Sequence, residues 1–390
     1  MWLLSQIVPL TAIYMMKPLK KSGSGVNTYI VNANLVLPDQ LVSDGSVVIR
    51  DGHIEAINPE SAPHTKVIDL QGNYLLPGLV DLHCDAIEKD FEARPGVFFP
   101  PELAVKAADE RNLMAGITTI FQSVAFDNGK GGVRSTERVV SLVHAVSNSH
   151  DTRVDNRIHA RYEMPHEAGA SALLALIDAG EVHLVSLMDH TPQENRSERK
   201  AAHMQMIESA DIEKTAPSVP DYVDNIVQTV RKQGIPLASH DNDTPELAAF
   251  FYEMGANICE FPLNIETAKA AHASGMPTIV GAPNLLRGGS HMGALSAADA
   301  ISEGAGDIVC SDYASQTLLP ALLRLPSLID IDLPAAVALG TRNPAYAVGL
   351  LDRGEIAVGK RADLIGVTQI ENWPRLVAAW SAGRCVFRTM

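Results

Sequence analysis

The sequence predicts an α/β fold in which a (β/α)8 barrel of the TIM type is joined to a small β-sandwich built from both ends of the chain. Three observations lead to this prediction. The middle of the chain alternates short apolar runs with helical patterns, which is typical of parallel βα units. Both ends instead carry short alternating runs separated by turn signals. A length of 390 residues suffices for one barrel and a small second domain.

The predicted barrel strands are apolar runs in the middle of the chain. They lie at residues 79–83, 117–125, 158–164, 183–188, 235–239, 257–261, 278–280 and 307–311. Helical patterns lie between them, for example at 101–115, 245–254, 265–274 and 297–303. The stretch 137–146 is ambiguous, so the number of units could differ from eight by one. In a barrel of this kind the active site lies at the C-terminal ends of the strands.

The two ends of the chain share a β-rich pattern. Asp-Gly turn signals at 44–45 and 51–52 separate short alternating runs within 28–69, and similar runs return at 354–364 and 378–387. We expect these ends to pair in one sandwich, although two independent hairpins are the alternative. The predicted domains are therefore a sandwich of residues 26–74 and 354–390 and a barrel of residues 75–353.

Residues 1–25 differ from the rest of the chain. An apolar run at 2–16 precedes Lys17, Lys20 and Lys21, whereas a signal peptide carries its positive charge before the apolar run. The run is also short for a membrane span. We expect an N-terminal extension whose status is uncertain, with a true start at Met15 or Met16 as one interpretation and a membrane anchor as the less favoured one.

Net charge and cysteine spacing indicate which kind of partner the protein binds and in which cellular compartment it works. The net charge of −15 at pH 7 argues against a basic surface for nucleic acid, while a local basic cluster could still bind a small anion. The four cysteines are widely spaced and form no CxxC motif, which favours reduced thiols in a cytoplasmic protein. A homo-oligomer is compatible with the sequence.

Ionisable residues follow several of the predicted strands. The apolar run 75–80 is followed by the polar residues His83 and Asp85, which are two positions apart. Residues two apart on a strand point to the same face. Imidazole and carboxylate together suit zinc, manganese or iron. Glu163, His190, His240 and Asp312 also follow apolar runs. One such residue is usually an exposed loop residue or a helix cap, but a set at strand ends converges on one barrel mouth and favours a metal site.

Several motifs resemble known enzymes. PGLVDLH at 77–83 is similar to the first barrel strand of the amidohydrolase superfamily, although most members have His-x-His where this chain has His-x-Asp. His-x-Asp with RPGV at 94–97 and GAPNLLRGGSH at 281–291 resembles the PhnM family, the diphosphatases of the carbon–phosphorus lyase pathway. The resemblance begins near residue 28 and extends to the end, and the segment 190–222 looks shorter than in that family.

The resemblance implies roles for the strand-end residues. The implied metal ligands are His83, Asp85, Glu163, His190, His240 and Asp312. In the superfamily the first pair binds one ion, a carboxylate corresponding to Glu163 bridges two ions, and the residue corresponding to Asp312 also handles the proton. The implied cofactor is a divalent metal, zinc by preference with manganese or iron as alternatives, in one or two copies.

A second group of residues is expected to bind phosphate. The glycines of Arg287-Gly288-Gly289-Ser290-His291 allow close backbone approach, and the arginine offers a bidentate fork. Lys89 and Arg94 could pair with a polyphosphate. The alternatives are a flexible glycine loop and ordinary surface salt bridges.

The resemblance implies a specific reaction. It is the hydrolysis of α-D-ribose 1-methylphosphonate 5-triphosphate, with attack of water on the α-phosphorus, to the 5-phosphate and pyrophosphate. The partner would be a small anionic phosphorylated substrate, without nucleic acid or membrane. One alternative is an amidohydrolase acting on an amide, a cyclic imide or an amino-purine. A second alternative is a non-catalytic subunit of a phosphonate-degrading assembly.

Overall fold

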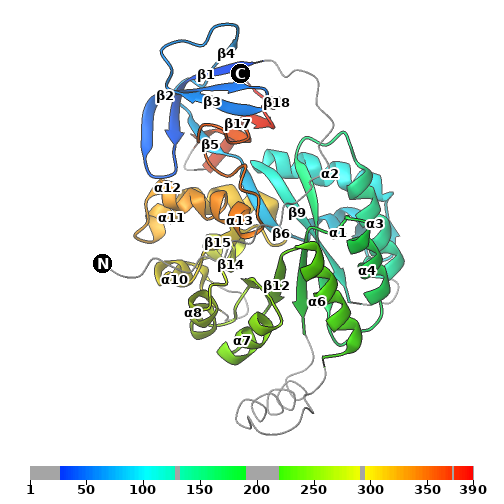
Figure 1. The fold of residues 1–390 in the computed structure, drawn as a ribbon. Helices are drawn as coiled ribbons and strands as arrows, with labels where there is room; N and C mark the ends of the chain where they lie inside the picture. The colour runs from blue at the N-terminus through cyan, green and yellow to red at the C-terminus, as the bar shows by residue number, and fades with distance from the viewer. Residues whose placement is uncertain (1–26, 128–131, 190–218, 290–294, 371–372, 390) are drawn as a thin grey trace.

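The chain folds into a parallel barrel and a second sheet that lies against one end of it (Figure 1). The computed structural model describes residues 27–127, 132–189, 219–289, 295–370 and 373–389. The residues implied by resemblance at positions 190, 290 and 291 lie outside these ranges, as does the extension at 1–25.

The barrel has the eight strands that the sequence predicts. They are β6 (Leu79–Cys84), β9 (Ile117–Phe126), β10 (Asp155–Glu163), β11 (Leu184–Met188), β12 (Leu237–His240), β13 (Ile258–Glu260), β14 (Thr278–Gly281) and β15 (Ile308–Cys310). Neighbouring strands are parallel and follow one another in chain order. Because helices cover the outer face and side chains fill the interior, the strands are largely buried on both faces, and they carry buried polar residues such as Gln122 and His159 beside the apolar ones.

The barrel is closed by hydrogen bonds between the first and the last strand. The backbone N–H of Asp312 donates to the carbonyl of His83 at 2.9 Å, and the N–H of Asp85 donates to the carbonyl of Asp312 at 2.9 Å. A parallel bridge joins Cys84 to Asp312 at the same point. The closure lies at the C-terminal ends of the strands, so it brings three residues from distant parts of the sequence to the barrel mouth.

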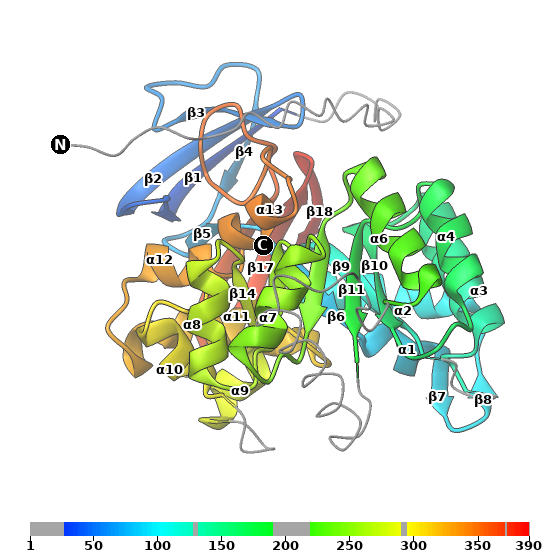
Figure 2. The same ribbon diagram turned by 60° about the horizontal axis from the view of Figure 1, so that its bottom comes forward.

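Helices surround the barrel, as Figure 2 shows. They are α1 (Ala86–Phe91), α2 (Pro101–Met114), α3 (Thr136–Asn148), α4 (Ala170–Asp178), α6 (Asp221–Gln233), α7 (Pro245–Glu253), α8 (Ile265–Ala273), α9 (Ala282–Arg287), α10 (Ala297–Ser302), α11 (Leu318–Leu328), α12 (Leu333–Ala338) and α13 (Arg342–Ala347). The ambiguous stretch 137–146 lies in α3, where Val139, Leu142, Val143 and Val146 share one buried face. A short hairpin of β7 (Glu92–Arg94) and β8 (Val97–Phe98) follows α1.

Both ends of the chain contribute to the second sheet. Its strands are β1 (Thr28–Val36), β2 (Leu41–Arg50), β3 (His53–Ile57), β4 (Lys66–Asp69), β5 (Tyr74–Pro77), β16 (Leu364–Ile370), β17 (Trp373–Ser381) and β18 (Arg384–Arg388). The two ends meet where β5 pairs antiparallel with β16. The prediction that the ends combine is confirmed, and they do so within one hydrogen-bonded sheet rather than as separate hairpins.

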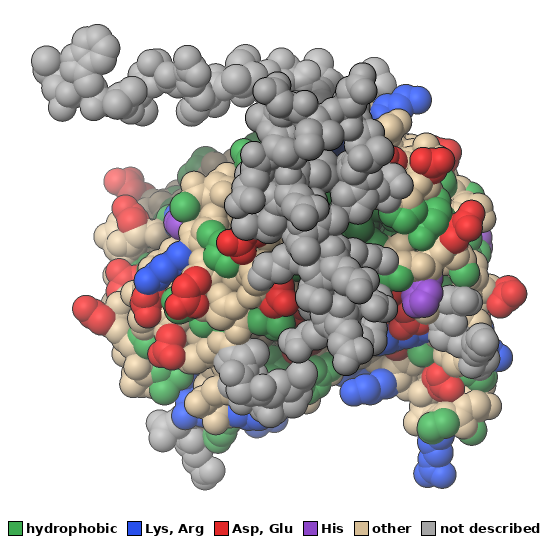
Figure 3. Space-filling view, turned by 90° about the horizontal axis from the view of Figure 1, so that it is seen from below, with side chains coloured by type: hydrophobic (Ala, Val, Ile, Leu, Met, Phe, Trp, Pro, Cys, Tyr) green, Lys and Arg blue, Asp and Glu red, His purple; other side chains and the backbone are tan. Residues whose placement is uncertain are grey.

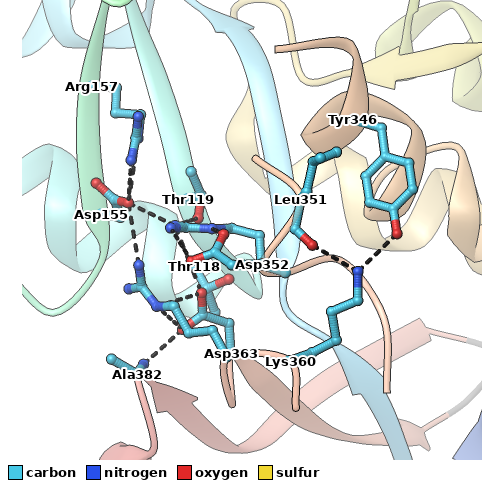
Figure 4. A network of polar contacts seen from close by, with 12 residues as sticks. Thr118, Thr119, Asp155, Arg157, Tyr346, Leu351, Asp352, Lys360, Asp363 and Ala382 are labelled. Atoms are coloured by element: carbon cyan, nitrogen blue, oxygen red, sulfur yellow. Dashed lines mark hydrogen bonds and ion pairs between the residues drawn. The ribbon is translucent and has the colours of Figure 1, made fainter. Parts of the chain in front are cut away.

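A network of polar contacts, which includes Thr119, Asp155 and Asp363, joins the second sheet to the barrel (Figure 4). The Arg353 side chain is 1% exposed, and its Nη1 donates to Thr119 Oγ1 of β9 at 3.0 Å and to Asp155 Oδ2 of β10 at 2.7 Å. Arg361 donates to Asp363 at 3.0 Å, and Asp363 lies 3.8 Å from Arg353. Burial raises the pKa of Asp155, but the neighbouring guanidinium groups outweigh burial and lower it below its ordinary value. The network therefore holds ionised carboxylates at the end of the barrel opposite the mouth.

No helix within the described ranges has both the length and the apolar character that crossing a membrane requires.

Candidate active site

Three side chains that suit a metal ion lie together at the barrel mouth. The ligand atoms of His83, His240 and Glu260 all lie within 4.8 Å of one another. They come from the ends of β6, β12 and β13, and His83 and Glu260 are fully buried. Two imidazoles and a carboxylate form a donor set that fits zinc, and also manganese or iron. The residues present therefore fit a divalent metal.

His83 is held by aromatic contacts. Its ring lies edge-on to Phe261 and to His159, with centroids 5.0 Å and 5.2 Å away, and 5.5 Å from the His240 ring. Burial, followed by the nearby charge of Arg161, lowers the pKa of His83 well below its ordinary value. The imidazole is therefore neutral near pH 7, which is the form that binds a metal.

Glu260 is a site residue that the sequence reasoning missed. It stands inside the apolar run Ile258-Cys259-Glu260-Phe261, for which the sequence pattern predicts only a strand. The signal that could have found it is an acidic residue near the C-terminal end of an otherwise buried strand. Charged residues are almost never fully buried unless they are paired or bind a metal.

A buried chain of hydrogen bonds orients Glu260. Ser186 Oγ donates to Glu260 Oε2 at 2.5 Å and lies 2.5 Å from His159 Nε2. His159 Nδ1 lies 3.0 Å from the backbone carbonyl of Leu82, which can only accept a hydrogen bond, so this nitrogen is placed to donate to it. Ser123 Oγ lies 3.1 Å from the same nitrogen. Partners of this kind fix the orientation of a metal ligand.

Asp312 lies at the mouth beyond the end of β15. Burial, and then the charge of Asp85, raises the pKa of Asp312 to about 6. A carboxylate with a pKa close to the working pH is suited to take a proton during catalysis. Asp312 is not one of the three clustered ligands among the described residues, so its predicted part in metal binding stays a prediction.

The backbone at the mouth adopts an uncommon conformation at three strand ends. Asp241, Phe261 and Asp312 follow β12, β13 and β15 and have φ values of 55°, 50° and 60°. Non-glycine residues seldom adopt positive φ, and such positions cluster at functional sites. At β12 and β13 this conformation directly follows His240 and Glu260, two members of the cluster.

Asp85 lies beyond the strand end and contacts arginines. β6 ends at Cys84, and Asp85 is the N-cap residue of α1. Its Oδ2 lies 3.3 Å from Arg161 Nη2 and 3.9 Å from Arg134 Nη2. Glu163 is buried at the end of β10, and like Asp85 it is not among the three clustered ligands of the described chain. Metal binding by these two carboxylates stays a prediction.

The predicted phosphate-binding residues lie on the outer part of the structure. Lys89 is exposed, with its Nζ 5.7 Å from the centre of the Tyr313 ring. Arg94 is exposed on β7, and Arg287 is exposed at the end of α9, where its Nε donates to the Pro283 carbonyl at 3.3 Å. Acidic and basic side chains are spread around the face seen in Figure 3.

The two glycines of the predicted phosphate loop have distinct conformations. Gly288 has a φ of 77° and ends α9 as its C-cap, which accounts for a glycine there without a ligand. Gly289 has a φ of 151°. The serine and histidine that follow, at 290 and 291, lie outside the described residues, so a phosphate role for the loop stays a prediction.

Asp81, two residues before His83, is a buried acid whose protonation can be tested. Its Oδ1 accepts from the backbone N–H of Ser311 at 3.1 Å and of His83 at 3.2 Å, and its Oδ2 accepts from Ser311 Oγ at 2.5 Å. Burial raises the pKa of Asp81 from 3.8 to about 7. The folded protein therefore keeps this proton over a pH range in which the unfolded chain has lost it.

Asp81 should stabilise chelator-treated protein most at low pH. We expect its contribution to the free energy of unfolding to fall as pH rises from about 4 to about 7. Asp81→Asn preserves the shape and can still accept from both backbone N–H groups and donate to Ser311. The variant should lack this part of the pH dependence and be at least as stable as wild type at pH 8. Urea unfolding at several pH values measures both. Parallel pH profiles for the two proteins would show that Asp81 is ionised in the fold.

Comparison with known proteins agrees with the fold and with this site. The amidohydrolase family pattern matches residues 74–386. The chain belongs to the amidohydrolase family and is a hydrolase. Its relatives include the α-D-ribose 1-methylphosphonate 5-triphosphate diphosphatase of Escherichia coli (strain K12), which is 34% identical over 377 residues, or 92% of this chain and 100% of that protein. This match confirms the resemblance to the PhnM family.

Other relatives are more distant. Imidazolonepropionase of Deinococcus radiodurans is 26% identical over 384 residues, covering 89% of this chain and 90% of that protein. N-acetylglucosamine-6-phosphate deacetylase from Pasteurella multocida has a TM-score of 0.64 at 15% identity, covering 92% of this chain and 99% of that chain. Molinate hydrolase has a TM-score of 0.64 at 16% identity, covering 93% and 95%. The two solved structures show a shared fold.

Proposed function

We propose that this chain hydrolyses α-D-ribose 1-methylphosphonate 5-triphosphate to the 5-phosphate and pyrophosphate, as a step in phosphonate breakdown. The observation that carries the proposal is the 34% identity over the whole length of the diphosphatase from Escherichia coli. The buried group of His83, His240 and Glu260 supports it, because a triphosphate needs a cation at the reacting phosphorus. A small anionic substrate, a cytoplasmic location and a possible homo-oligomer belong to the same proposal.

His83, His240 and Glu260 would hold a divalent metal, zinc by preference with manganese or iron as alternatives. When bound, such an ion lowers the pKa of water and polarises a phosphoryl oxygen. Asp312 would take the proton from the attacking water. The new bond joins the water oxygen to the α-phosphorus, and the bond between that phosphorus and the α,β-bridging oxygen breaks. We propose Asp85, Glu163 and the histidine at 190 as further ligands if a second ion is present.

Charge must also be neutralised on the departing pyrophosphate. We propose Lys89, Arg94, Arg287 and the loop continuing through residues 288–291 for this role, because charge-assisted hydrogen bonds to phosphate are strong. We also propose residues 26–74 with 354–390 and residues 75–353 as the two domains. The reaction would then be confined to the second of these units.

The second candidate function is hydrolysis of a cyclic amide or imide. Its specific support is the 26% identity to an imidazolonepropionase over 89% of the chain. The same metal ligands would then direct water to a carbonyl carbon rather than to phosphorus. The buried cluster of metal-type side chains gives less support to a non-catalytic subunit, since burying such groups without function is costly.

A product analysis in 18O-labelled water tests the proposal. Purified protein with measured metal content is given the ribosyl triphosphate, a nucleoside triphosphate and an imidazolone, and products are followed by phosphorus NMR and mass spectrometry. We expect pyrophosphate from the ribosyl substrate, with the label on the ribose-bound phosphate, and loss of turnover after chelation. Label in pyrophosphate would refute attack at the α-phosphorus. Turnover of the imidazolone alone would favour the second candidate.

A further inference from the structure

Arg161 is a buried cation that points into the barrel. Its side chain is 8% exposed. On β10 it alternates with Ala160 and Tyr162, which pack in the core cluster between barrel and helices, so Arg161 shares the inward face with His159 and Glu163. Neither the predicted metal set nor the predicted phosphate set includes this residue. Its position between a buried histidine and the strand end places it at the depth of the metal-type side chains.

The hydrogen bonding of Arg161 is incomplete. Its Nη2 lies 3.3 Å from Asp85 Oδ2 and 3.8 Å from Glu88 Oε1. Its Nε is buried and has no hydrogen-bond partner among the described residues. A buried donor on a charged group is costly to leave unpaired, and each such group in a folded protein calls for an explanation. An oxygen of a bound ligand would satisfy this donor.

The acids beside Arg161 already have another cation. Arg134 Nε lies 2.9 Å from Glu88 Oε2, and its Nη2 lies 3.9 Å from Asp85. Arg134 therefore pairs with the same two acids from a side chain that is 37% exposed. Neutralising Asp85 and Glu88 thus does not by itself explain why a second arginine is buried at the mouth.

Arg161 also lies beside the candidate reacting groups. Asp85, which Arg161 contacts at 3.3 Å, stands two residues after His83. The backbone N–H of Asp85 donates to the carbonyl of Asp312 at 2.9 Å. The guanidinium group is thus near both a candidate metal ligand and the candidate proton acceptor, where a phosphoryl group would be held.

We propose that Arg161 binds the substrate directly, donating from Nε to a non-bridging oxygen of the α-phosphoryl group. This inference rests on the proposed function and names the residue that would supply the positive charge beside the metal. Arginine suits the role because its planar group can keep Asp85 on one nitrogen while another nitrogen faces the phosphate. Negative charge on the phosphoryl oxygens would then be shared between Arg161 and the metal.

The test measures binding of ribose 5-phosphate, whose phosphate corresponds to the α-phosphoryl group, rather than turnover. Wild type, Arg161→Met, Arg161→Lys and the matched control Arg134→Met are loaded with the same metal. Binding of ribose 5-phosphate is measured by calorimetry, and metal content by elemental analysis. We expect Arg161→Met to bind ribose 5-phosphate about tenfold to a hundredfold more weakly, and Arg161→Lys to recover part of the loss. Arg134→Met should change affinity less than about threefold, and metal content should be the same in all four.

Three outcomes would overturn the inference. Ribose 5-phosphate affinity in Arg161→Met equal to that of wild type would show that the donor does not face the ligand. Equal losses in Arg161→Met and Arg134→Met, with matching falls in melting temperature, would assign Arg161 to the ion-pair network alone. A wild-type protein that neither binds ribose 5-phosphate nor hydrolyses the ribosyl triphosphate would refute the proposed function itself, and this inference with it.

Discussion

Replacing Glu260 by glutamine is expected to weaken metal binding by more than about a hundredfold and to lower kcat/KM by about a thousandfold. The carboxylate is the charged member of the cluster with His83 and His240, and it is fully buried. Glutamine keeps the size of the side chain but supplies a neutral oxygen that binds a divalent ion poorly. Ser186 would no longer donate to an anion, so the orientation of the side chain would also be lost.

Metal titration with elemental analysis, followed by steady-state kinetics, measures both effects. Ser186→Ala provides a graded comparison, because it removes only the partner of the ligand and should cost about tenfold to a hundredfold in metal affinity. Glu266→Gln is the matched control, since Glu266 is exposed in the first turn of α8 and should behave as wild type. If Glu260→Gln retained its metal and its rate, Glu260 would not be a ligand.

Replacing Arg353 by methionine is expected to lower the free energy of unfolding by about 2–3 kcal/mol. The reason is that Asp155 and Asp363 would lose their most deeply buried cation and keep only Arg157 and Arg361, and Thr119 would lose its partner. Removing one member of a buried ion pair is far costlier than removing an exposed one. Because the network joins the barrel to the second sheet, the contact between these two parts should become the least stable region of the fold.

Urea unfolding followed by circular dichroism measures the change. Arg50→Met removes an exposed ion pair with Glu55 on the second sheet and should leave the midpoint near that of wild type. The Arg353 variant, where folded, should keep the metal content of wild type because the network lies at the opposite end of the barrel from His83. An unfolding midpoint shared by both variants and wild type would contradict a stabilising role for the network.

The barrel could be predicted because its strands are largely buried on both faces. Each strand therefore lies in a run rich in apolar residues, although buried polar residues such as Gln122 and His159 stand within some of the runs. Strand-end residues such as His83, His240 and Asp312 were visible for the related reason that a polar residue interrupts an apolar run. The closure of the barrel then brings such residues to one mouth without any further information.

The missed residues share a different property. Glu260 and Arg161 lie within strand patterns, and each is buried because its polar atoms face other polar atoms across the barrel. Ser186, which donates to Glu260, looks in the sequence like any small residue of a strand. Pairing across a barrel depends on register and closure, and neither can be derived from local sequence. The position of Arg161 beside Asp85 is of this kind.

The hydrogen bonds that close the barrel have a consequence for how the protein is made. His83 and Asp85 are synthesised early, yet their backbone partner Asp312 emerges from the ribosome only near the end of translation. Contacts between such distant parts of a chain form slowly, because the intervening loop must be ordered first. The nascent polypeptide therefore has no competent pocket for most of its synthesis. A truncation that removes the last barrel strand would abolish activity entirely rather than reduce it.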